Sequence, residues 1–324
     1  MLRRRFLAAL GAFTLAPILL LAQQRSAKPP RIGILSPFNA SSDAFRVAVQ
    51  QRLQELGYTE GRNLVIEYRA SNDIADRLQP LAAELVSVRV DAIVTTTAAG
   101  VQAAKQATAT IPIIMAGVDD AVGQGFVTNL AKPGGNITGT TWLNTELSAK
   151  RVELLKQALP TLSRVAFLRE AVGAASSLHA TEAAARTLGM HLVVMEIRAP
   201  NEIDGVFLAL AQERVGALMV AQGPMLTDQE QHVIELARKH LLPTMFAFRK
   251  AVEAGGLMSY GPTPVDLYRR AAEFVDRILK GDRPGALPVE QPTKFELVIN
   301  LKTANALGVS LPRAILLSAD EVIR

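Results

Sequence analysis

The stretch Ala92-Ile93-Val94-Thr95-Thr96-Thr97 is followed by an alanine-rich segment from Gly100 to Thr108, and then by Ile111-Pro112-Ile113-Ile114-Met115-Ala116-Gly117. The two flanking runs are short, apolar and rich in β-branched residues, which predicts two buried strands. The alanine-rich segment between them favours a helix, and Pro112 is compatible with the start of a strand. Continuously apolar strands joined by a helix indicate a parallel sheet that helices cover on both faces.

The same alternation continues on both sides of this unit. It predicts strands over 31–36, 63–69 and 137–140, and helices over 45–56 and 78–88. It then restarts, with strands over 164–168, 191–197, 217–221 and 243–246 and helices over 146–159, 176–188, 202–212 and 227–239. A shorter tail has strands over 257–260 and 295–300 and helices over 267–280 and 303–307. We expect two doubly wound lobes that share this tail, so the chain crosses between them near Trp142, Tyr260 and Gln291-Pro292.

The N-terminus has the pattern of an export signal, which we place at residues 1–28. Arg3-Arg4-Arg5 precedes an apolar run over 8–22, and the chain then becomes polar. That run is about fifteen residues, shorter than the roughly 20 that a membrane-spanning helix needs. The alternative is a retained N-terminal anchor. The arginines also fit a twin-arginine signal.

Charge and cysteine content narrow the classes of partner. The formal charge of +5 comes from Arg3, Arg4, Arg5, Arg25 and Lys28, because subtracting these five leaves the mature chain near zero. This argues against nucleic acid and anionic membranes as partners. There is no cysteine, which excludes disulfides, thiolate metal sites, cysteine nucleophiles and a lipid-modified cysteine. An exported protein without an anchor is expected in a periplasm.

Several longer segments carry a family resemblance, namely 56–63 (LGYTEGRN), 132–139 (KPGGNITG), 254–261 (AGGLMSYG) and 291–304 (QPTKFELVINLKTA). Together they make the chain resemble the substrate-binding proteins of ABC importers, of the subgroup similar to tryptophan and tyrosine binders. The resemblance implies a type I periplasmic-binding fold: two doubly wound parallel-sheet lobes, a three-strand hinge, and a ligand closed between the lobes. We assign 1–28 to a signal peptide, 29–141 plus 262–290 to an N-terminal lobe, and 142–261 plus 291–324 to a C-terminal lobe.

Ligands of open α/β sheets bind beyond the carboxyl ends of the strands, so the first-lobe loops there are candidate sites. Phe38 is a candidate for stacking on a planar ligand, and its neighbours Ser36 and Asn39 for hydrogen bonds; the alternative is an ordinary turn. Thr96, Thr97 and Ala98 lie where a strand enters a helix, whose N–H groups suit a carboxylate, although Thr97 can simply cap that helix.

Asp120 is the candidate partner for a ligand ammonium group, and the resemblance implies the same position. The alternative for Asp119 and Asp120 is one helix cap and one solvated acid. The candidates in the second lobe are Gln222, Phe248 and Arg169. Arg169 either clamps a ligand carboxylate or pairs with Glu170 at the surface. At the predicted crossings, Trp142 and Tyr260 are candidate cleft walls, with a core position as the alternative for Trp142.

No catalytic or cofactor motif is present. The four histidines lack metal-ligand spacing, and there is no G-x-S-x-G, G-x-G-x-x-G or P-loop. We therefore expect no enzyme activity, no metal and no cofactor. The predicted function is the extracytoplasmic solute-binding component of an ABC importer, a monomer that captures a small zwitterionic or carboxylate ligand by hinge closure, such as an amino acid, aromatic ones included. Its partners are then a membrane permease and a separate ATPase. The alternatives are a periplasmic sensor that presents the solute to a receptor or kinase, and an enzyme on this scaffold.

Overall fold

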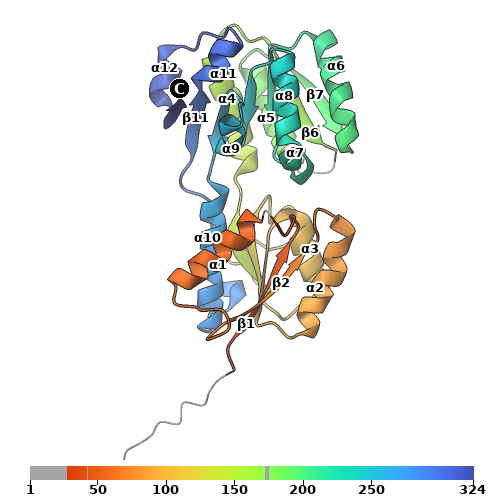
Figure 1. Cartoon of the computed structure of the whole chain (residues 1–324), viewed down its shortest axis with the longest axis vertical. Helices are drawn as coiled ribbons and strands as arrows, with labels where there is room; N and C mark the ends of the chain where they lie inside the picture. The colour runs from red at the N-terminus through yellow and green to blue at the C-terminus, as the bar shows by residue number, and fades with distance from the viewer. Residues whose placement is uncertain (1–27, 42, 172–174) are drawn as a thin grey trace, which may run out of the picture.

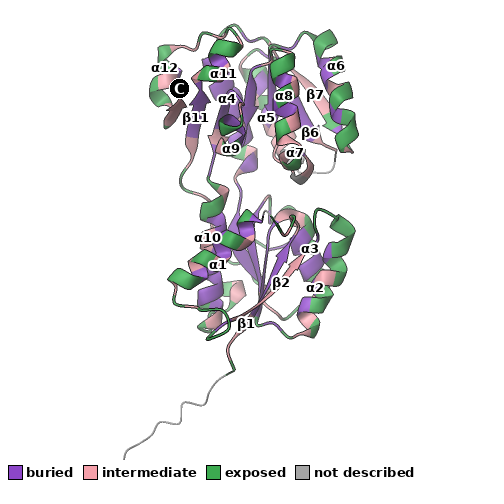
Figure 2. Ribbon diagram, in the orientation of Figure 1, coloured by how far each residue is buried: buried purple, intermediate pink, exposed green. Residues whose placement is uncertain are grey.

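The computed structural model describes residues 28–41, 43–171 and 175–324. The predicted signal peptide lies outside these residues except for Lys28. The described chain forms two lobes, each built on one sheet with helices on both faces (Figure 1). Figure 2 shows the central strands of each sheet as buried, some edge strands as intermediate, and the outer faces of the helices as exposed.

The first lobe contains a five-stranded parallel sheet of order β2-β1-β3-β4-β5. Its strands are β1 (Arg31–Ser36), β2 (Val65–Ala70), β3 (Ala92–Thr95), β4 (Ile113–Val118) and β5 (Ile137–Thr141). Its helices are α1 (Ala44–Glu55), α2 (Leu78–Ser87), α3 (Thr97–Ala107) and, from much later in the chain, α10 (Pro264–Leu279). Burial of β3 and β4 along their whole length agrees with their largely apolar sequence, whereas β5 is fully buried although three of its five residues are threonine.

The second lobe contains a seven-stranded sheet of order β12-β11-β10-β9-β8-β6-β7. Its strands are β6 (Arg164–Glu170), β7 (His191–Ile197), β8 (Ala217–Val220), β9 (Thr244–Phe246), β10 (Met258–Gly261), β11 (Glu296–Asn300) and β12 (Glu321–Ile323). Its helices are α4 (Asn144–Ala158), α5 (Ala175–Thr187), α6 (Ile203–Glu213), α7 (Pro224–Asp228), α8 (Glu230–Lys239), α9 (Arg249–Glu253), α11 (Leu301–Ala306) and α12 (Arg313–Ser318). All neighbouring pairs are parallel except β10 and β11, which are antiparallel.

The late helix α10 belongs to the packing of the first lobe. Tyr268 of α10 meets Phe45 of α1 edge to face, with ring centroids 5.3 Å apart. Phe274 of α10 is fully buried in the same core cluster, which also contains Ile32 and Ile114 of the sheet. Burying one such aromatic side chain contributes about 2 kcal/mol, so α10 is an integral part of this lobe.

The chain passes between the lobes three times: after β5, after β10, and before β11. These crossings lie at the positions expected from the sequence. The first and third run beside each other, because Thr141 N–H donates to the carbonyl oxygen of Glu290 at 2.9 Å. Arg270 of α10 also forms an ion pair with Glu290. The crossing segments are thus tied to one another near the first lobe.

The structure differs from the sequence-based expectation in a few short elements. The helix expected over 227–239 is two helices, α7 and α8, which meet at Gln229. The helices α9 and α12 and the strand β12 were not expected, because their few residues show no clear periodicity in the sequence. Among the described residues, no helix combines the length and apolarity that a bilayer span requires.

Candidate functional site

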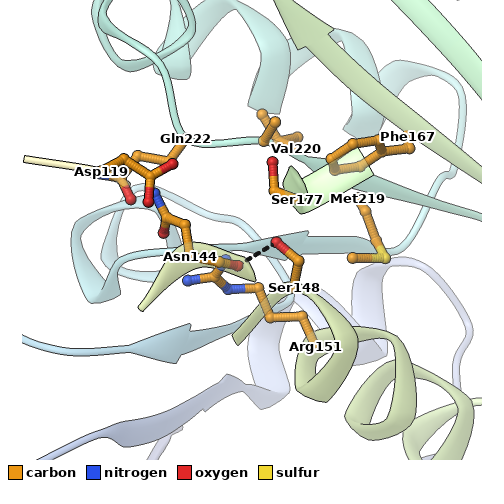
Figure 3. A pocket seen from close by; sticks show the side chains of 10 residues that line it. Asp119, Asn144, Ser148, Arg151, Phe167, Ser177, Met219, Val220 and Gln222 are labelled. Carbon is orange, nitrogen blue, oxygen red and sulfur yellow. Dashed lines mark hydrogen bonds between the residues drawn. The ribbon is translucent and has the colours of Figure 1, made fainter. Parts of the chain in front are cut away.

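A pocket lies at the carboxyl edge of the second sheet, where that edge meets the first lobe. It encloses about 380 Å³ of empty space, its open mouth included. Figure 3 shows polar groups on one side of the pocket and Phe167 and Met219 on the other. The lining residues are Asp119, Asn144, Ser148, Arg151, Phe167, Ser177, Met219, Val220, Ala221 and Gln222. Asp119 follows β4 of the first lobe, and the others come from the second lobe, so both lobes contribute to the site.

Arg151 of α4 is the main positive group of this pocket. Its side chain is 4% exposed, and its Nε donates a hydrogen bond to the carbonyl oxygen of Tyr260 at 2.7 Å. Its Nη2 is buried and has no hydrogen-bond partner among the described residues. Burial lowers the pKa of Arg151 to about 10, so the guanidinium is still charged at neutral pH. The pocket therefore contains a buried positive charge with a free donor.

Arg151 was not predicted from the sequence, although a signal was present. Leu147, Arg151 and Leu155 follow one another at intervals of four, so they share one helix face. Leu147 and Leu155 are buried on the inner face of α4, and Arg151 is buried with them. A charged residue within an apolar helical stripe indicates a functional site or a buried ion pair, because burying a charge costs free energy.

Asp119 brings a carboxylate from the first lobe to the same pocket. Burial raises its pKa to about 6; the side chain of Asn144 hydrogen-bonds to it and opposes this rise, and so does the charge of Arg151. At neutral pH most of this carboxyl is ionised, with a substantial protonated fraction at slightly acidic pH. Asp119 is thus a negative group whose charge is only partly compensated.

The predicted ligand residue Asp120 points elsewhere. Its φ of 44° directs its carboxylate back to the following turn, where Oδ1 accepts a hydrogen bond from Gly123 N–H at 2.9 Å. Asp120 is exposed and does not line the pocket. The structure therefore places Asp119, rather than Asp120, in the pocket.

Gln222 was predicted to contact ligand and lines the pocket. Its Oε1 is buried without a hydrogen-bond partner among the described residues, so the pocket also offers a free acceptor. The loop that carries Gln222 is held by Glu170, whose Oε1 accepts from Leu226 N–H at 3.0 Å. A Cβ at Gly223 would overlap this carboxylate, which explains the glycine after Gln222.

The predicted crossing residues lie beside the pocket rather than in it. Trp142 and Phe248 pack against each other with ring centroids 5.4 Å apart, and Trp142 is 8% exposed. Tyr260 supplies the carbonyl oxygen that orients Arg151. Arg169, at the end of β6, forms an ion pair with Glu196 at 2.5 Å. None of these four side chains lines the pocket.

The first-lobe candidates make local hydrogen bonds at the ends of β1 and β3. Ser36 Oγ accepts from Phe38 N–H at 3.2 Å, and Thr96 Oγ1 donates to the carbonyl oxygen of Ala116 at 2.8 Å. Thr97 Oγ1 accepts from Gly100 N–H at 3.3 Å, and Asn39 Oδ1 from Ser41. With Ala98, they remain outside the pocket lining, and their contact with ligand stays a prediction.

The pocket combines a buried guanidinium, a carboxylate, an amide acceptor and an apolar wall. This set complements a small molecule with a carboxylate, an ammonium group and an apolar part. Among the residues that the structure describes, no group of three or more His, Cys, Asp or Glu is placed to hold a metal ion.

The family described as ABC transporter substrate binding protein matches residues 32–323. A tyrosine-binding protein of Clostridioides difficile is 27% identical over 301 residues, which cover 92% of this chain and 85% of that protein. A Streptococcus pneumoniae ABC domain solved in complex with L-Trp is similar with a TM-score of 0.83 and 26% identity, covering 91% of this chain and all of that one. A conserved domain protein of Vibrio cholerae has a TM-score of 0.85 and 26% identity over the same share.

These similarities confirm the fold class expected from the sequence, two α/β lobes with parallel sheets of the type I periplasmic-binding kind. They also confirm the resemblance drawn from the sequence segments. The matched family spans nearly the whole described chain. The chain therefore belongs to the family of ABC transporter substrate-binding proteins.

Proposed function

We propose that this protein captures a free amino acid with an aromatic side chain in the pocket between its lobes, and delivers it to an ABC importer. The main observation that supports this proposal is the buried Nη2 of Arg151, which has no hydrogen-bond partner among the described residues. The protein acts as a monomeric periplasmic binder without catalytic turnover. Its partners are a membrane permease and a separate ATPase.

The ligand carboxylate binds Arg151. A buried donor that lacks an acceptor costs about 1–3 kcal/mol, and a carboxylate oxygen at Nη2 removes this cost. The hydrogen bond from Nε to the Tyr260 carbonyl fixes the guanidinium plane, so Nη2 presents one defined direction. Arg151 therefore supplies both charge and orientation.

The ligand ammonium group binds Asp119 and Gln222, which provide a carboxylate and a free amide oxygen. Asp119 belongs to the first lobe and Arg151 to the second. A zwitterion that contacts both stabilises the arrangement with the lobes drawn together, which is the basis of hinge closure. Phe38, half-buried after β1 and packed against the first-lobe core, is the first-lobe side chain that we expect to face the ligand in the closed arrangement.

The relatives support the aromatic class of ligand. One is named a tyrosine-binding protein, and the solved ABC domain contains L-Trp. In this chain the apolar wall of Phe167, Met219 and Val220 suits the carbon atoms next to the charged groups of such an amino acid.

Calorimetric titration with paired ligands tests this proposal. L-Trp has both charged groups, tryptamine lacks the carboxylate, and indole-3-propionate lacks the amine. We expect the wild type to bind L-Trp at least about tenfold tighter than either analogue, since each analogue leaves a buried charge unpaired. Arg151→Gln should weaken L-Trp and indole-3-propionate but not tryptamine, and Asp119→Asn should weaken L-Trp and tryptamine but not indole-3-propionate.

Arg164→Gln is the matched control, because Arg164 lies at the opposite end of β6 and pairs with Glu213 on the surface. This variant should bind like the wild type. The proposal is wrong if no aromatic amino acid binds, or if Arg151→Gln weakens all three ligands equally.

A further inference from the structure

A second hollow adjoins the pocket along the same sheet edge. The two share Val220, Ala221 and Gln222, which follow or end β8. The remaining lining residues of the second hollow are Leu226, Thr227, Glu230, Phe246, Ala247 and Phe248. A ligand whose charged end contacts Gln222 in the first pocket can therefore extend into the second.

The walls of this hollow suit a flat apolar group. Phe246, at the end of β9, is 3% exposed, and Leu226 of α7 is 2% exposed. Phe248 packs on Trp142, which holds its ring in place. Fixed aromatic and aliphatic walls bind a planar ring through dispersion and through burial of its surface.

Glu230 places a carboxylate in this apolar setting. It is the first residue of α8, and an acid in the first turn is favourable for the helix. A carboxylate that only stabilised the start of the helix could equally well point into solvent. Glu230 instead lines the hollow. Among the described residues its carboxylate forms no hydrogen bond, and the charge that acts on it favourably is that of Lys250. Burial raises the pKa of Glu230 in spite of Lys250.

We propose that the second hollow holds the side chain of the amino-acid ligand, and that Glu230 accepts a hydrogen bond from a neutral donor on its ring. This inference rests on the proposed function. Such donors are the phenol hydroxyl of tyrosine and the indole N–H of tryptophan. A neutral donor fits better than a cation, because Lys250 already supplies a positive charge to Glu230. Glu230 is then a specificity residue that separates tyrosine and tryptophan from phenylalanine.

The experiment is calorimetric titration of L-Tyr, L-Trp, L-Phe and L-Lys into the wild type, Glu230→Leu and Glu230→Gln. In Glu230→Leu we expect L-Tyr and L-Trp to bind about tenfold weaker and L-Phe to change less than about twofold, because only the first two lose an acceptor. Glu230→Gln keeps a neutral acceptor and should lose less affinity than Glu230→Leu. Glu235→Leu is the matched control, since Glu235 is exposed on the same helix.

Thermal melting of each variant establishes that it is folded before titration. The inference is overturned if Glu230→Leu weakens L-Phe as much as L-Tyr, which is the signature of a purely structural role. It is also overturned if the wild type prefers L-Lys, which indicates a cation subsite. The proposed function itself fails in a different way, namely when the wild type binds none of the aromatic amino acids.

Discussion

Replacing Asp119 by asparagine should stabilise the ligand-free protein and weaken ligand binding at the same time. Asparagine keeps the shape of the side chain and an oxygen that accepts from Asn144, but it removes the buried negative charge. Burial is the main reason that the pKa of Asp119 rises from its ordinary 3.8 to about 6. The substitution thus isolates what that charge costs the fold and what it contributes to binding.

The magnitude follows from proton linkage. A rise from 3.8 to about 6 corresponds to about 3 kcal/mol, at roughly 1.4 kcal/mol per pH unit. Between these two values the folded state binds more protons than the unfolded chain, so the stability contributed by Asp119 falls as the pH rises through this window. The advantage of Asp119→Asn should therefore grow from about 1 kcal/mol at pH 4.5 to about 3 kcal/mol at pH 8.

The assay is denaturant unfolding of both proteins between pH 4.5 and 8, followed by the fluorescence of Trp142, the single tryptophan. Asp120→Asn, at the exposed neighbouring position, also removes one carboxylate from this turn, but it acts on the pKa of Asp119 only as a smaller contribution than burial, so its effect on the pH dependence should be smaller. Titration of L-Trp at pH 7.5 should show the opposite effect, a loss of about tenfold or more in affinity. A difference in unfolding free energy that is constant across this pH range would refute the reasoning, because a desolvated carboxyl must produce a pH-dependent one.

Two glycine substitutions test the packing that positions the site, both by thermal melting. Gly139→Ala should destabilise the protein by more than about 3 kcal/mol, because Gly139 has a φ of 127° and a Cβ there would overlap the carbonyl oxygen of Met115. The control is Gly135→Ala, where a Cβ would meet open space and the loss of stability should be less than about 1 kcal/mol. Equal losses in the two variants would contradict this prediction. Gly117→Ala should lower the stability of the protein by about 1–3 kcal/mol and shift the fluorescence of Trp142, since the new Cβ would lie 2.8 Å from the indole. An unchanged emission spectrum would show that the position of the Trp142 ring does not depend on this glycine.

The sequence predicted the position of an element well where most of that strand or helix is buried. β1, β3 and β4 are apolar along their length because helices cover both faces, so their extents were predicted to within a few residues. The short helices α9 and α12 were missed, since their few residues show no clear apolar periodicity.

The pocket was predictable only in part. Gln222 follows a buried strand, and this position alone placed it at the ligand edge of the sheet. Asp119 and Asp120 are indistinguishable in the sequence, and the backbone turn at Asp120 decides which carboxylate enters the pocket. Arg151 and Glu230 lie on helices, where a charged residue usually faces solvent, so neither the burial of Arg151 nor the place of half-buried Glu230 in the second hollow was expected.

The longer strands and helices, the division into two lobes and the three crossings could be predicted from the sequence, because hydrophobic periodicity and turn residues act over short distances along the chain. Nothing in the sequence showed that the first turns of α4 lie beside the end of β4, and this arrangement brings Asp119 and Arg151 to one pocket from different lobes. The physical reason is that a desolvated charge depends on everything packed around it, and these neighbours come from segments far apart in the sequence.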